Sequence, residues 1–436
     1  EAFRDASSLR LAASWRRSDC ENCEAEWRLM LRDSSMEFLQ HFLLGKPLER
    51  NAQRSALLSY ARSQPLAASW LGDDLALRVG LDLERAATRL LETQAGPTLE
   101  GSAAARAIRP AGRHYDYAVQ LAAAGLGAAL EGRAAPWLWR VSLRGDRVAY
   151  GYDNRMRDGN TAEDGTPCPG GCLYSRPADR RDRFAVLTPR LEVIRALGDG
   201  HHVYAVLSDG FRPPEITELY RLQRNQRVAE LEAEALRAAE LGWRFGLGET
   251  RAGALRGSLA LFRARKSNVI LRDANGFNAI GGRTRHEGTE YELQWRLTED
   301  WQLAAGGAYA RHRYDFTRAI EGGETLTAGR EIDTAPRNIH RLAASAALPY
   351  ALQLELEARY TGGYFADAAN ERRHPAQTVL GLRARWQASP QLALTLDVDN
   401  LADRLLADRA DFAQGDWRYF PARRRSAYVG VDWRSR

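Results

Sequence analysis

Long apolar runs, lysine, methionine and cysteine are all scarce in this 436-residue chain. The longest notable uncharged run, residues 117–130, has 14 residues and two glycines. A helix needs roughly 20 apolar residues to cross a bilayer, so the sequence predicts no transmembrane helix. It also contains no Ser-His-Asp elbow, phosphate loop, zinc-protease helix or nucleotide fingerprint. We therefore predict neither an enzyme nor a bound cofactor.

Only four cysteines are present, as two local pairs, Cys20 with Cys23 and Cys168 with Cys172. Three disulfide connectivities are formally possible, and a four-cysteine zinc site is the alternative. A zinc site requires that both pairs converge, and no local feature favours this. We expect two disulfides in an oxidising compartment. No metal site is expected, because the acidic segment 153–164 lacks the regular order of a calcium loop.

What the chain does have is strict alternation of apolar and polar residues. In Leu352 to Tyr360 every second side chain is apolar, which predicts a strand with one apolar face. Seventeen such strands are predicted, with ends uncertain by about 2 to 4 residues. They cover residues 7–17, 24–33, 53–63, 75–86, 115–132, 137–150, 183–196, 201–209, 236–247, 253–265, 286–298, 300–312, 338–348, 350–361, 377–388, 391–399 and 425–434.

The connections between these strands alternate between short turns and long polar loops. The short ones include residues 248–252, 298–300, 349–350 and 388–390, and the long ones include 153–182, 211–235, 313–337 and 400–424. Long structureless loops are uncommon in compact soluble domains. Short turns at one end and long loops at the other are typical of outer-membrane barrels. The fold class predicted is therefore all-β, an antiparallel transmembrane β-barrel with long extracellular loops and short periplasmic turns.

The barrel is expected to be a single domain over residues 1–436, because no linker divides the chain. Bacterial single-chain barrels have even strand numbers, whereas seventeen is odd. We therefore expect that the chain is the C-terminal part of a larger barrel and has lost an odd number of strands. Two unpaired strand edges would result.

Basic residues number 62, but only Lys46 and Lys266 are lysines, and the net charge is +6. A basic chain invites a nucleic-acid interpretation. The arginines are scattered through strands and loops and often neighbour Asp or Glu, with no basic stripe or aromatic stacking module. We predict no nucleic-acid partner and assign the arginines to a mixed-charge barrel interior.

Two segments depart from the strand pattern. Pro213 and Pro214 favour a short loop helix over residues 214–222. Residues 228–241 are rich in strong helix formers, so a helix over 228–235 and an irregular loop there stay open as alternatives. From about residue 236 onward the alternation predicts a strand.

Several motifs, in this order and spacing, resemble those of TonB-dependent outer-membrane receptors. The resemblance covers roughly residues 115–433 and is weaker before them. The motifs are Gly210-Phe211-Arg212-Pro213-Pro214-Glu215 with Glu218-Leu219-Tyr220, the segment Glu234 to Gly242, Phe262 to Arg272 with Gly288-Thr289-Glu290, Asp399 to Asp403, and Arg418 to Pro421 with Arg423 to Arg425.

The resemblance implies a barrel of about 22 strands around an N-terminal plug, of which seventeen strands and no plug are present here. It implies location in the outer membrane of a Gram-negative bacterium, with lipid and lipopolysaccharide as neighbours. The expected function is active uptake of a ferric siderophore or a similar small metal chelate, energised by the TonB complex through the missing plug. The family's terminal Phe is absent, since Trp433 is followed by Arg434, Ser435 and Arg436.

The resemblance also places the capture site in the loops 152–182, 211–235, 313–337 and 400–424. Guanidinium pairs well with carboxylate oxygens, so loop arginines suit an anionic chelate. The candidate ligand-binding residues are Arg212, Tyr220, Arg221, Arg224, Arg318 and Arg330. The alternative is that these arginines only form salt bridges within the loops or with lipopolysaccharide. The alternative function is a passive porin-like channel, because a barrel without a plug would leak.

Overall fold

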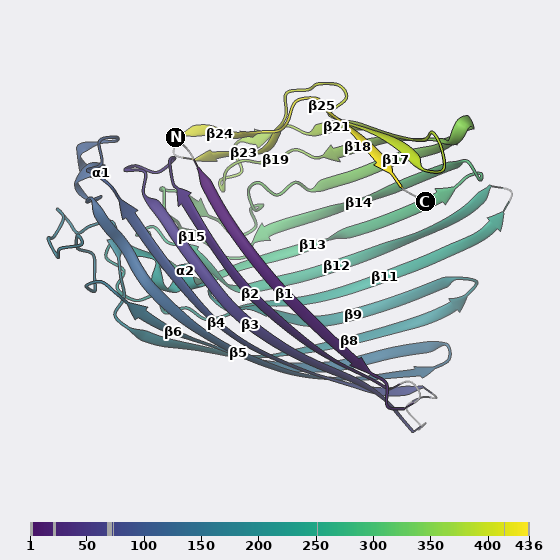
Figure 1. The fold of residues 1–436 in the computed structure, drawn as a ribbon, viewed down its shortest axis with the longest axis horizontal. Coiled ribbons are helices and arrows are strands. Elements are labelled where there is room, and N and C mark those ends of the chain that lie inside the picture. The colour runs from purple at the N-terminus through teal and green to yellow at the C-terminus, as the bar shows by residue number, and fades with distance from the viewer. Residues whose placement is uncertain are drawn as a thin grey trace.

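One large antiparallel sheet of seventeen strands dominates the computed structural model, which describes residues 3–20, 23–67, 72, 74–250, 252–413 and 415–434. Figure 1 shows the sheet rolled into a strongly curved wall of long, tilted strands. Each strand pairs with its neighbours along the chain. The strands are β1 (Arg4–Arg17), β2 (Glu24–Leu39), β3 (Leu48–Leu66), β4 (Leu75–Gln94), β5 (Gly112–Ala134), β6 (Trp137–Asn154), β8 (Arg180–Gly198), β9 (His201–Arg212), β11 (Glu234–Thr250), β12 (Gly253–Arg272), β13 (Asn278–Arg296), β14 (Trp301–Tyr314), β17 (Asn338–Leu348), β18 (Leu352–Thr361), β21 (Gln377–Gln387), β22 (Leu392–Asp399) and β25 (Ser426–Trp433).

Smaller elements lie in the connections between these strands. Four two-stranded ribbons are formed by β7 (Tyr174–Ser175) with β10 (Leu222–Gln223), β15 (Arg318–Ala319) with β16 (Thr325–Leu326), β19 (Tyr364–Phe365) with β20 (Arg373–His374), and β23 (Ala407–Ala413) with β24 (Asp416–Pro421). The helices are α1 (Ala103–Ala107), α2 (Ile216–Tyr220) and the 3₁₀ turn η1 (Pro349–Ala351). Among the described residues, no helix has the length and apolar character needed to span a membrane.

The pairing register gives the sheet two chemically different faces. On the outward face Leu126, Leu143 and Leu187 are exposed, on β5, β6 and β8. On the inward face of β4 and β6, Arg144 forms ion pairs with Asp82 and Asp146, both at 2.7 Å. Because side chains alternate along a strand, one register sets both faces. The mixed-charge interior that the arginine distribution predicted is therefore present.

Tryptophan marks the short-turn end of the sheet. Eight of the eleven tryptophans lie within about three residues of a strand end there. They are Trp15, Trp27, Trp137, Trp139, Trp295, Trp301, Trp386 and Trp433. Aromatic girdles of this kind sit at the membrane–water interface of outer-membrane barrels, so this ring sets one boundary of the apolar belt.

All seventeen predicted strands correspond to strands of the main sheet, but the observed strands are longer at the long-loop end. β4 ends at Gln94 rather than near residue 86, and β13 begins at Asn278 rather than near residue 286. The outward face of β4 becomes charged in this region, at Arg85 and Arg89. The alternation signal therefore fades although backbone pairing continues.

The loop predictions had mixed outcomes. The helix predicted over residues 214–222 is α2, whose Glu215 N–H donates to Glu218 Oε2 at 2.7 Å. No helix forms over residues 228–235, and β11 begins at Glu234. Helix α1 and the four ribbons were not predicted, because segments this short carry no periodicity. Within the described ranges, β1 pairs only with β2 and β25 only with β22.

A charge on the outward face should destabilise the sheet, whereas the same charge on the inward face should not. Leu143 is exposed on the outward face of β6, two outward positions beyond Trp139 and inside the apolar belt. We expect Leu143→Arg to lower the free energy of unfolding of the chain in liposomes by about 2 to 4 kcal/mol, measured by urea titration. The matched control is Ser142→Arg, whose side chain faces inward. Equal losses for the two variants would contradict the assignment of faces.

Candidate functional site

Long loops lie at the end of the sheet opposite the tryptophan ring; besides residues 95–111, which contain α1, there are five from β6 onward. We name them loop I (residues 155–179), loop II (213–233), loop III (315–337), loop IV (362–376) and loop V (400–425). Loops I, II, III and V correspond to the predicted capture loops. Each loop contacts the next, so together they form one layer.

Loops I and II are joined by backbone pairing. β7 in loop I pairs with β10 in loop II, and Arg224 N–H donates to Leu173 O at 2.6 Å. A disulfide joins Cys168 to Cys172 immediately before β7, with 4.8 Å between the Cα atoms. The disulfide thus closes the turn that presents β7 to loop II.

The other loops continue the contacts around the layer. Arg224 of loop II lies 3.6 Å from a carboxylate oxygen of Glu321 in loop III. Glu331 N–H in loop III donates to Asn370 Oδ1 in loop IV at 2.7 Å. Phe412 N–H in loop V donates to Ala366 O in loop IV at 2.8 Å. Loops from distant parts of the sequence therefore hold one another in place.

A tyrosine cluster anchors loop II to the inward face of the sheet. Tyr115, Tyr117, Tyr150 and Tyr152 on β5 and β6 are buried against α2 and β10. The ring of Tyr220 in α2 stacks on Tyr152, with 4.3 Å between the centroids. Aromatic pairs in this geometry add to the free energy of burial. The base of loop II is therefore packed as a small hydrophobic core.

Tyr220 was predicted to contact a ligand, but its hydroxyl is already engaged. It donates to Asp182 Oδ2 at 2.7 Å, at the start of β8. Burial, and then the hydrogen bond to Asp182, raise the pKa of the Tyr220 hydroxyl. The structure thus places Tyr220 in the anchor of loop II.

Arg221, the next residue, connects loop II to two strands far away in the sequence. Its Nη1 lies 2.9 Å from Glu49 Oε2 on β3, and its Nη2 bonds Glu92 on β4. The Glu92 side chain is 1% exposed. Burial opposes the charge on Arg221, but Glu92 and Glu49 outweigh this effect and raise its pKa. The guanidinium therefore bridges two acidic groups on the interior wall.

Arg212, at the end of β9, is also held by carboxylates. Its Nε lies 2.9 Å from Glu234 Oε2, and two further nitrogens bond Glu218 at 3.0 Å. This fork ties both ends of loop II to α2. Arg212 and Arg221 thus form salt bridges within the loop layer, as in the alternative considered for these arginines.

The other three predicted arginines keep unused donors. Arg224 makes one long ion pair, Arg318 donates to Ile280 O at 2.8 Å, and Arg330 donates to Ala369 O. A guanidinium has five N–H donors, so most remain available at each residue. Contact of these residues with a ligand stays a prediction.

Sequence reasoning did not identify the partners that fix the site. Glu49, Glu92, His114 and Arg176 are buried around loop II, and His114 Nδ1 lies 3.0 Å from Glu92 Oε1. Glu49 is separated from Arg221 by 172 residues. No local pattern predicts a contact over such a separation.

The acidic residues of loop I are dispersed rather than gathered. Asp158 accepts from Asn154 Nδ2, Glu163 from Arg113, and Asp164 from Thr166 N–H. In the part of the chain that the structure describes, one group of potential metal ligands comes together, Asp19 with Cys20 and Cys23. A disulfide joins these two cysteines, so they offer no thiolates.

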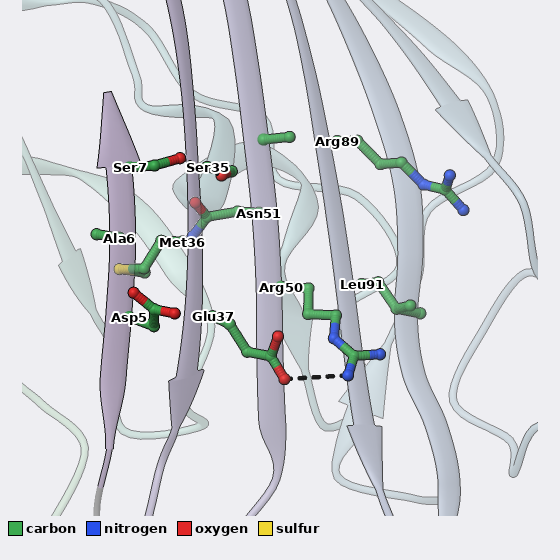
Figure 2. A pocket seen from close by; sticks show the side chains of 11 residues that line it. Asp5, Ala6, Ser7, Ser35, Met36, Glu37, Arg50, Asn51, Arg89 and Leu91 are labelled. Carbon is green, nitrogen blue, oxygen red and sulfur yellow. Dashed lines mark hydrogen bonds and ion pairs between the residues drawn. The ribbon is translucent and has the colours of Figure 1, made fainter. Parts of the chain in front are cut away.

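Figure 2 shows a cavity on the long-loop side of β1 to β4. Its lining mixes both charges, and Arg50 Nη2 lies 3.0 Å from Glu37 Oε1 across the strand pair. Arg89, at the far side of the cavity, lies 3.5 Å from Asp116. Two acidic residues, Asp5 and Glu37, and two basic residues, Arg50 and Arg89, line the cavity, so its net charge is zero.

Comparisons with known proteins place these features in a family context. Residues 32–401 match the family model described as TonB dependent receptor-like, beta-barrel. The metal-pseudopaline receptor CntO of Pseudomonas aeruginosa is 26% identical over 239 residues, 51% of this chain and 30% of that receptor. The ferrioxamine receptor of Yersinia enterocolitica is 30% identical over 154 residues, 34% of this chain and 21% of that receptor.

A solved structure shows the same fold over nearly the whole chain. The siderophore receptor PiuA from Acinetobacter baumannii matches with a TM-score of 0.76 at 15% identity. The match covers 99% of this chain and 65% of that one. This chain therefore spans less than two thirds of the length of the receptors it resembles.

Removal of the Arg221 guanidinium should release loop II. Arg221→Ala would leave Glu49 and Glu92 buried without a counter-charge, which costs about 3 to 5 kcal/mol. We expect lower stability and faster proteolysis within loop II. The control is Arg224→Ala, because its ion pair is half exposed and should contribute at most about 1 kcal/mol. If loop II resists proteolysis as well in Arg221→Ala as in the parent chain, Arg221 is not the anchor of this loop.

Loop I should loosen in acid. Glu163 accepts from Arg113 N–H at 2.8 Å and from Arg113 Nε at 2.5 Å. These contacts hold the pKa of Glu163 below its ordinary value of 4.5. Their stabilisation is complete above pH 4.5 and is lost as the pH falls through the lowered pKa.

Pepsin cleavage of loop I, followed from pH 6 to pH 2, measures this effect. We expect protection of loop I to fall below pH 4.5, after correction for the pH dependence of pepsin on an unfolded substrate. Glu163→Gln should be cleaved readily at every pH. If the parent chain and Glu163→Gln show the same dependence of loop I cleavage on pH, the prediction is wrong.

Proposed function

Because this chain belongs to the TonB-dependent receptor family through its β-barrel domain, we propose that it captures a scarce metal chelate for active uptake. A ferric siderophore or similar chelate is the proposed substrate class. The proposed location is the outer membrane of a Gram-negative bacterium, with energy supplied through the TonB complex. The match to the family model over residues 32–401 carries this proposal.

The names of the relatives support a chelate as the ligand. They are called receptors for metal-pseudopaline and for ferrioxamine, both of which are metal-binding small molecules. The family consists of transport receptors rather than enzymes, which supports transport over catalysis here. The layer formed by loops I to V supports capture at the extracellular end of the barrel.

Within this layer we assign capture of an anionic chelate to Arg224, Arg318 and Arg330. Each has guanidinium donors that the protein does not use. Arg212 and Arg221 instead hold the loops in place through carboxylates. Guanidinium matches carboxylate geometry, so chelates that carry carboxylates fit this set.

Chelate binding by the folded chain in detergent micelles tests both the function and the site. We expect a panel of ferric chelates to include one, with carboxylate groups, that binds and quenches tryptophan fluorescence. The double variant Arg318→Gln, Arg330→Gln should bind this chelate about tenfold or more weakly, because each charge-assisted hydrogen bond contributes about 1.5 to 3 kcal/mol.

A matched variant and a genetic test separate the possible outcomes. Arg263→Gln with Arg265→Gln removes the same charge from the outward face of β12 and should bind as the parent chain does. Binding that is insensitive to the loop variant would reject the arginine site. Failure of every chelate to bind, together with unchanged growth of a deletion strain under metal limitation, would reject the function.

A further inference from the structure

The outward face of β3 to β8 carries a group of arginines just above the apolar belt. Arg54 on β3, Arg85 on β4, and Arg181 and Arg183 on β8 line one shallow cavity, which we call the arginine trough. All four side chains are exposed. They occupy the outward positions of their strands, whereas the charged interior network of Arg144 lies on the opposite face.

Between Arg85 and Arg183 the floor of the trough is made of small residues. In the register, Arg85 pairs with Ala122, Ala122 with Ala149, and Ala149 with Arg183. Three strand spacings separate Arg85 from Arg183, which is about 14 Å. Small floor residues leave space between the two arginine walls. The trough can therefore accept a headgroup that bridges about this distance.

Three of the four arginines in the trough have no acidic partner among the described residues. Arg54 lies 2.9 Å from Asp33 Oδ2. Arg85, Arg181 and Arg183 have no ion pair or side-chain hydrogen bond with any of the described residues. This distinguishes the trough from the neighbouring cavity in Figure 2, where Arg50 is matched by Glu37.

The surface below the trough is mainly apolar, with Arg147 of β6 as an exposed charged residue one outward position below Ala149. Leu83 is the next outward-facing residue after Arg85 on β4, on the side of the short-turn end. Leu126 on β5 and Leu187 on β8 are also exposed on this face. A ligand of the trough would thus have its charged end among arginines and its body against leucines. That is the chemistry of an anionic amphiphile at the boundary between headgroups and acyl chains.

We propose that the arginine trough binds the phosphorylated headgroup of lipopolysaccharide, with acyl chains against Leu83, Leu126 and Leu187. Guanidinium groups bind phosphate through paired hydrogen bonds. Two arginine walls about 14 Å apart suit a headgroup with two phosphates rather than the single phosphate of a phospholipid. This inference rests on the outer-membrane location given under the proposed function, and it adds a specific lipid partner.

The test is titration of the folded full chain, in non-ionic detergent, with diphosphoryl lipid A, followed by native mass spectrometry. Arg85→Gln with Arg183→Gln should weaken binding about tenfold or more, because each arginine near an anionic lipid surface contributes roughly a fivefold factor. Arg85→Lys with Arg183→Lys should keep most of the affinity. Heat-modifiable mobility in gels confirms that each variant is folded.

The matched control is Arg263→Gln with Arg265→Gln, which removes two exposed outward arginines from β12. We expect it to bind lipid A as the parent chain does. If this control loses as much affinity for lipid A as Arg85→Gln with Arg183→Gln does, the lipid is attracted to exposed arginines in general. That result would overturn the trough as a specific site. No loss in the trough variant would also overturn it.

Two further ligands identify the source of the phosphate. Lipid A without phosphates should bind at least tenfold more weakly than the diphosphoryl form, and inorganic phosphate at millimolar concentration should not compete. Competition by inorganic phosphate would make the trough a site for free anions and overturn the lipid proposal. Chelate binding should be unchanged in the trough variant, so failure of the chelate function and failure of the lipid site are distinguishable.

Discussion

The structure depends on one constraint, that strand backbones within a membrane must satisfy their hydrogen bonds with neighbouring strands. This constraint produces the long ladders of the sheet and fixes the register of every pair. A slip of one residue would reverse both faces of a strand. It would put Arg144 and Asp146 of β6 into lipid and turn Leu143 inward. The register therefore selects which arginines meet acidic groups and which meet the membrane.

The loops obey a different rule, because they lie beyond the apolar belt where water can reach the backbone. Their order comes from side chains on the upper, inward part of the strands. Tyr152 supports Tyr220 by stacking, and Glu49 and Glu92 hold Arg221. These contacts fix the base of loop II, whereas other parts of the layer have fewer contacts. The exposed guanidinium groups of loop III, such as that of Arg330, belong to such parts.

The strands could be predicted from the sequence because alternation is a local property that each strand carries by itself. The ends of the strands on the long-loop side could not be predicted. In β4, for example, Arg85 and Arg89 interrupt the apolar pattern although the strand continues to Gln94. The motif at residues 210–220 located α2, and the proline pair gave its start. The candidate site was predicted as a set of loops but not as a set of contacts. Arg221 has no sequence feature that distinguishes an anchor from a ligand contact, because Glu92 is 129 residues away.

Arginine is the main charged residue of this chain, yet the residue type alone says little about its role. Arg144 stabilises the interior wall, Arg221 anchors a loop, and Arg85 lies outward with no acidic partner. The three differ in what surrounds the guanidinium, and the strand register sets those surroundings. An arginine in the middle of the lipid-facing belt would carry a large desolvation cost. At the outer boundary of the belt that cost is small, so charge can remain there for a ligand from the membrane itself.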